Sequence, residues 1–80
     1  MTFFEYMMRY LKKDTPEGDL ARDIKDDKKH FPSSDNGKEI FNYLVSQSAC
    51  HECLDTFVKC YSRYVRYEMK KLLKNREEWQ

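Results

Sequence analysis

The 80-residue sequence predicts a small all-α bundle of four to five helices that ends in a long C-terminal helix. Apolar residues recur at helical spacing along most of the chain, and only 2 Gly and 2 Pro interrupt it. Capping residues precede most of the periodic segments. A chain of this length folds as one domain, residues 1–80, around one small core. We therefore do not expect a deep catalytic cleft.

Capping signals define the first two helices. Thr2 and Glu5 form a capping-box pattern, and the apolar positions that follow predict a helix from about Phe3 to Lys12. Thr15 and Pro16 are typical of a helix start, so a second helix is expected from Pro16 to about Lys28. Its few apolar residues predict a surface helix with one narrow buried stripe.

Turn-forming residues separate these helices from the rest of the chain. The segment 30–37 contains Pro32 and is expected to be a loop that Phe31 attaches to the core. A third helix, Gly37 to Ser46, follows an Asp35 or Asn36 cap. From residue 49 to about 78 the chain can be helical throughout, but Asp55-Thr56 resembles a new cap. We therefore expect a short helix at 50–54 and a final helix from 55 onward.

The predicted core draws on every helix and on the loop. It comprises Phe3, Phe4, Met7, Leu20, Ile24, Phe31, Ile40, Tyr43, Leu44, Leu54, Phe57, Tyr61 and Tyr64. In the final helix, Val65, Met69 and Leu72 extend the same apolar side.

The order of these landmarks resembles the YozE-like proteins, a family of small bacterial proteins of uncharacterised function. The resemblance rests on the opening residues 1–10, on His30-Phe31-Pro32, on the third helix, and on Thr56-Phe57 with the tyrosines that follow. It spans about residues 2–67 and implies a sterile-alpha-motif-like (SAM-like) bundle, without supplying a catalytic residue. The chain departs from the family pattern at Tyr61, where a Trp is expected, at Cys50–Cys53, and in a basic extension beyond Tyr67.

Charge is distributed unevenly, although the formal net charge is only +1. Residues 14–39 are acidic overall, whereas the only acid between positions 57 and 76 is Glu68. Five bases of that segment fall within about 80° of a helix surface, with Tyr67 at the margin; they are Lys59, Arg63, Arg66, Lys70 and Lys74. Such a face can neutralise nucleic-acid phosphates while a tyrosine stacks on a base. The same pattern is typical of the solvated face of a packed helix.

Three cysteines are the candidate metal ligands. Cys50 and Cys53 have the spacing of half a zinc site, and Cys60 with His51 or His30 would complete four ligands. A structural zinc site usually has a second closely spaced pair, which this chain lacks. Free cysteine also behaves as a small buried hydrophobe. We therefore predict no metal and no other cofactor, and we do not expect an enzyme, because no nucleophile with its base or Gly-rich phosphate loop can be assembled.

The expected role is a non-catalytic interaction module. No segment approaches the ~20 apolar residues of a membrane span, so no membrane partner is expected. The odd number of clustered cysteines indicates reduced thiols, and the N-terminus lacks a secretion signal, so we expect a cytoplasmic protein. A protein partner is the first hypothesis and nucleic acid the alternative. We expect a monomer or weak self-association. The acidic second helix offers a surface either for the basic face of another copy or for a different protein.

Overall fold

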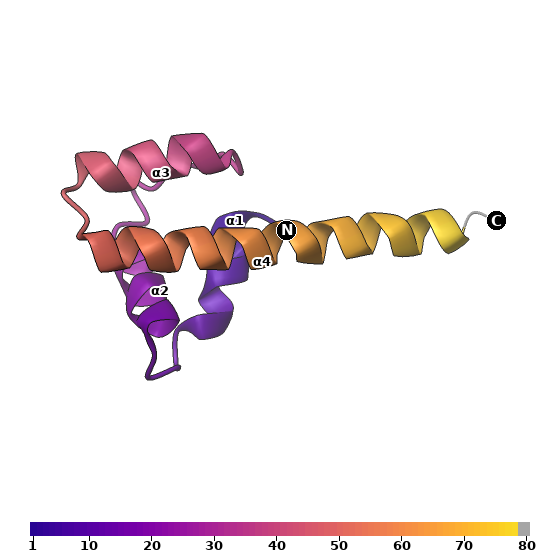
Figure 1. The fold of residues 1–80 in the computed structure, drawn as a ribbon, viewed down its shortest axis with the longest axis horizontal. Coiled ribbons are helices and arrows are strands. Elements are labelled where there is room, and N and C mark those ends of the chain that lie inside the picture. The colour runs from indigo at the N-terminus through magenta and orange to yellow at the C-terminus, as the bar shows by residue number, and fades with distance from the viewer. Residues whose placement is uncertain (79–80) are drawn as a thin grey trace.

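The computed structural model describes the backbone of residues 1–78 and the side chains of residues 1–75. It contains α1 (Phe3–Met7), a 3-10 helix η1 (Met8–Tyr10), α2 (Pro16–Asp26), α3 (Gly37–Ser46) and α4 (His51–Glu78). Within these residues there is no strand, so the predicted all-α fold is confirmed. As Figure 1 shows, α3 lies on one side of the N-terminal half of α4 and α1 and α2 lie on the other, and the rest of α4 continues alone. The molecule is therefore elongated, 47 × 26 × 22 Å.

The helix starts lie where the capping signals predict them. Thr2 and Glu5 form the full capping box of α1, and the Thr15 hydroxyl accepts a hydrogen bond from the backbone amide of Gly18 at 3.2 Å. The Asn36 side chain, not that of Asp35, caps α3. The Asp35 carboxylate instead accepts a hydrogen bond from the backbone amide of Phe3, the first residue of α1.

The first helix is shorter than predicted. It ends at Met7 and tightens into η1, whereas the sequence pattern predicts a helix to Lys12. The chain must reverse here to enter α2, and the Arg22 guanidinium binds two backbone carbonyls of this turn. Its Nη1 donates to the carbonyl oxygens of Leu11 and Lys13 at 2.8 and 3.2 Å.

The predicted break at Asp55 is wrong, because α4 is continuous from His51. Asp55 lies on the solvent side and pairs with His51 one turn earlier, 3.4 Å apart. Thr56 turns its hydroxyl back to the carbonyl of Glu52 at 2.9 Å, as a mid-helix threonine does. A continuous helix buries Phe57 on the same face as Cys53 and Cys60. This packing outweighs the capping tendency of Asp55-Thr56, so the helix does not break there.

The core is centred on Phe3. This side chain is 0% exposed, and its ring centroid lies 5.5 Å from those of Phe57 and Tyr64 and 5.6 Å from that of Tyr61. Nine of the predicted core residues are buried: Phe3, Met7, Leu20, Ile24, Phe31, Ile40, Leu44, Phe57 and Tyr64. The other four, Phe4, Tyr43, Leu54 and Tyr61, are only partly buried at its edge. Tyr6, Ala21 and Cys60 are buried as well, although the prediction did not include them.

Hydrogen bonds from two core tyrosines attach the loop and the N-terminus to α4. The Tyr61 hydroxyl donates to the carbonyl of Asp35 at 2.8 Å and accepts from the amide of Gly37 at 3.0 Å. The Tyr64 hydroxyl donates to the carbonyl of Met1 at 2.6 Å. The Asp35 carboxylate accepts from the amide of Phe3 at 2.9 Å. Tyr61 therefore supplies a polar tether between the loop and α4 that an indole ring, which has no acceptor, cannot copy.

Candidate interaction surface

The α4 helix leaves the bundle near Tyr67 and Glu68. Tyr67 receives a hydrogen bond from Arg9 of η1, and Glu68 lies 3.7 Å from the N-terminal ammonium group. Beyond these two residues the apolar side chains of α4 are open to solvent: Met69 is 55% exposed and Leu72 62%. Figure 1 shows this part of the helix projecting past α1 and α3. None of the described helices is long and apolar enough to cross a bilayer.

We define the α4 apolar stripe by its five exposed hydrophobic residues: Val58, Val65, Met69, Leu72 and Leu73. They are 40–62% exposed. At about 100° per residue they share an arc of about 100°, whose centre lies roughly 110–130° around the helix from the buried Phe57 and Tyr64. The prediction that Val65, Met69 and Leu72 continue the core is therefore wrong, since they lie to one side of it and most of them lie beyond the end of the bundle.

Helix α3 exposes two further apolar side chains. Phe41 is 36% exposed and Val45 50%. The Phe41 ring centroid lies 6.3 Å from that of Phe57, the residue just before Val58 of the stripe. Every exposed large hydrophobic residue of the described part of the chain except Met1 thus belongs to α3 or α4.

The five predicted basic-face residues are all exposed on α4: Lys59, Arg63, Arg66, Lys70 and Lys74. Arg63 differs from the other four in having an acidic partner, because its Nη1 lies 3.7 Å from Oε1 of Glu17 in α2. Side-chain hydrogen bonding with Tyr10 raises the pKa of Arg63. The pKa of Glu17 is lowered, first by its own backbone amide, then by Thr15, and also by Arg63. Arg63 therefore belongs to the contact between α2 and α4.

Tyr67, the predicted stacking residue, lies between two bases. Arg9 Nη2 donates to the Tyr67 hydroxyl at 2.9 Å, and Arg9 Cζ lies 4.5 Å from the ring centroid. Lys71 Nζ lies 5.3 Å from the same centroid. The structure thus adds Arg9 and Lys71 to the basic face. The sequence carries no local signal for the first of these, because 58 residues separate Arg9 from Tyr67.

The three cysteines do not converge on one point. Cys50 is exposed and precedes α4, Cys53 is partly buried, and Cys60 is buried. Seven residues of helix separate Cys53 from Cys60 by about 10 Å, whereas two sulfurs on one zinc ion lie within about 4.6 Å. Burial raises the pKa of Cys60 to about 11 and also raises the pKa of Cys53. Both groups are therefore neutral thiols at pH 7 and not activated nucleophiles. The two histidines proposed as further ligands, His51 and His30, are both exposed.

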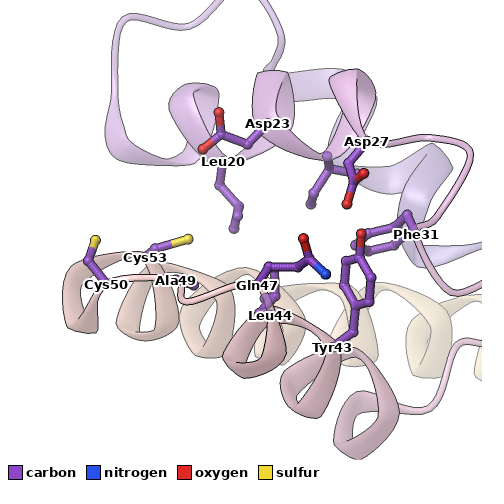
Figure 2. A pocket seen from close by; sticks show the side chains of 11 residues that line it. Leu20, Asp23, Asp27, Phe31, Tyr43, Leu44, Gln47, Ala49, Cys50 and Cys53 are labelled. Atoms are coloured by element: carbon purple, nitrogen blue, oxygen red, sulfur yellow. The ribbon is translucent and has the colours of Figure 1, made fainter.

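A cavity of about 280 Å³ separates α2 from α3 and the start of α4. As Figure 2 shows, Asp27, just after α2, faces Tyr43 of α3 across it, and Asp23 of α2 and Gln47, just after α3, also line it. Its floor is apolar and includes Leu20, Ile24, Phe31 and Leu44. The buried Tyr43 hydroxyl has no hydrogen-bond partner within the described residues. This pocket suits an apolar group beside a hydrogen-bonding or cationic one.

Short helices packed on one side of a long C-terminal helix define this chain as a SAM-like helical domain. The family model described as YozE SAM-like fold matches residues 2–66, and the chain belongs to that family. The match ends where α4 leaves the bundle, so most of the exposed stripe lies beyond it. Comparison with curated proteins and with solved structures found no match.

Proposed function

We propose that this protein is a non-catalytic interaction module that binds another polypeptide through the α4 apolar stripe. The exposure of this stripe is the observation that carries the proposal. Scattered single hydrophobic residues are normal on a protein surface, but an apolar row on one helix face marks a docking site. A helical row spaced by three, four and seven residues matches a partner that lies along the helix.

The projection of α4 supports the same role. Residues 69–75 extend from the bundle as an amphipathic helix, with Met69, Leu72 and Leu73 on one side and bases on the other. Isolated helices of this length are marginal in water, and an apolar face that meets a partner stabilises them. A surface of this kind offers a partner a long and accessible contact without any change in the bundle.

Site-specific photo-crosslinking in the cells of origin tests this function. Benzoylphenylalanine at position 72, in the stripe, is expected to give a discrete crosslinked polypeptide. The same probe at position 25, on an exposed site of α2, is the matched control. Crosslinking from position 72 should disappear when Met69 is changed to Glu. Equal adducts from both positions, or none from the stripe, would contradict the proposal.

Nucleic-acid binding is the second candidate, and the basic face favours it. Arg9 and Lys71 flank Tyr67, next to the exposed Lys70 and Lys74. Phosphate contacts by these bases predict an affinity that falls steeply with salt. Fluorescence anisotropy with single- and double-stranded DNA at two salt concentrations compares the wild type with Lys70→Glu/Lys74→Glu. Micromolar binding at physiological salt that the double variant abolishes supports this candidate, and equally weak binding by both proteins excludes it.

We further propose that the protein acts in the bacterial cytoplasm. The family is one of small bacterial proteins. Free thiols at Cys50, Cys53 and Cys60 fit a reducing compartment. Oxidation-sensitive thiol labelling in intact cells should find all three cysteines reduced.

A further inference from the structure

We infer that the polypeptide bound by the α4 apolar stripe is a second copy of this chain, in an antiparallel dimer of two α4 helices. The inference rests on the proposed function, since it names the partner of the same surface. Its evidence is a row of charged side chains beside the stripe.

The charged row comprises Glu52, Asp55, Lys59, Arg66 and Lys70. These residues are all exposed, and on a continuous helix they share an arc of about 60° along one border of the stripe. The row is acidic at its N-terminal end and basic from position 59 onward. A second copy that runs in the opposite direction presents the same row reversed, so that acids meet bases.

The pairs fit one register. Glu52 and Lys70 lie nine residues before and nine after Tyr61, and Asp55 and Arg66 lie six before and five after it. With the twofold axis near this position, Glu52 faces Lys70 of the second copy and Asp55 faces its Arg66. Twofold symmetry repeats both pairs, which gives four ion pairs in the dimer.

Residues at the axis permit close approach. Ser62 lies between Val58 and Val65 on the stripe side, and its hydroxyl is already bonded to the carbonyl of Val58 at 2.9 Å. A small side chain with no unsatisfied donor can therefore lie at the centre of a helix pair without a desolvation cost. Lys59 faces Ser62 and Arg63 of the second copy, and each Arg63 is already paired with Glu17 of its own chain.

The same register covers the projecting part of α4. Met69 and Leu72 lie eight and eleven residues beyond Tyr61, so they reach the start of α4 in the second copy. The end of α3 adjoins that region and exposes Val45 to 50%. The overlap extends for about 30 Å of helix and covers exposed apolar residues of α4 and Val45 of α3 in each copy.

Two α4 helices that run in the same direction lack this charge complementarity, because the bases of one row then lie beside the bases of the other. An anionic surface would attract the bases but would place its negative charge against Glu52 and Asp55. The separation of acids and bases along the row therefore favours a second copy over nucleic acid or lipid as the occupant of this face.

Sedimentation velocity of the full chain over a range of concentrations tests the inference by charge exchange. The wild type should form a dimer. Arg66→Asp or Asp55→Arg alone should weaken it by roughly tenfold or more, because each turns two ion pairs into like-charge contacts. An equimolar mixture of the two variants should recover the dimer, since Asp then faces Arg at both sites. Lys74→Asp, with the same charge change outside the row, is the control and should dimerise like the wild type.

Circular dichroism confirms that each variant keeps its fold. A wild type that stays monomeric at its highest soluble concentration overturns the inference, and so does a dimer that the single variants leave unchanged or that their mixture fails to restore. If the chain is monomeric and position 72 still crosslinks a different polypeptide, the proposed function stands and only the self-association is wrong. If position 72 crosslinks nothing, the proposed function itself fails.

Discussion

The aromatic contacts of Phe57 make a quantitative prediction about stability. This side chain is 3% exposed and contacts the rings of Phe3, Phe41 and Tyr61 at centroid distances of 5.5, 6.3 and 5.6 Å. Phe57→Ala removes the ring from the centre of the core and leaves a cavity, so the free energy of unfolding should fall by about 3–5 kcal/mol. An 80-residue domain has only about 4–12 kcal/mol in total.

Urea titration followed by far-UV circular dichroism measures this loss. With a slope of about 1 kcal/mol per M, the midpoint should fall by about 3 M or the variant should be unfolded in buffer. If Phe57→Ala is unfolded in buffer, Phe57→Leu should still fold and show a smaller decrease in the urea midpoint. Val58→Ala is the matched control, because Val58 is the next residue and 51% exposed, and it should cost less than about 0.5 kcal/mol when the protein is monomeric. A loss below about 1 kcal/mol for Phe57→Ala would refute the central place of this ring.

Three further predictions concern other contacts. Tyr61→Phe should cost about 1–2 kcal/mol in urea titration, because it removes both hydrogen bonds that the hydroxyl makes to the loop. Gly18→Ala should cost about 2–3 kcal/mol, since its Cβ would lie far inside contact distance of the backbone carbonyl oxygen of Lys13. Burial raises the pKa of Tyr64 to about 12 and of Cys60 to about 11, whereas the unfolded groups ionise near 10 and 9. The folded state therefore keeps these protons longer, so the urea midpoint should decrease as the pH rises from 9 to 12.

Local patterns in the sequence predict the helices well, because caps and periodicity act within a few residues. Thr2, Thr15 and Asn36 begin helices as their side chains indicate. Asp55 shows the limit of this reasoning. An Asp-Thr pair is compatible both with a cap and with a helix interior, and only the packing of the flanking residues on the core decides between them.

The site is less predictable than the fold. The arc of bases on α4 can be read from helical spacing, but its partners cannot: Arg63 is engaged by Glu17 of α2, and Tyr67 by Arg9 of η1. Helical spacing of apolar residues also does not show whether another helix covers them. Met69 and Leu72 follow the pattern of core residues, and they are exposed because the other helices end before they reach them.

The length of α4 connects these observations. Its first part is held by the core, from Phe57 to Tyr64, whereas residues 69–75 make a helix whose apolar side is mostly exposed. A helical segment of this length draws little stability from propensity alone, so its population depends on what covers Met69 and Leu72. Binding along the stripe therefore couples to helix formation in the extension, and the backbone amides of residues 69–75 should gain protection from hydrogen exchange when the partner binds, while those around Phe57 stay protected throughout.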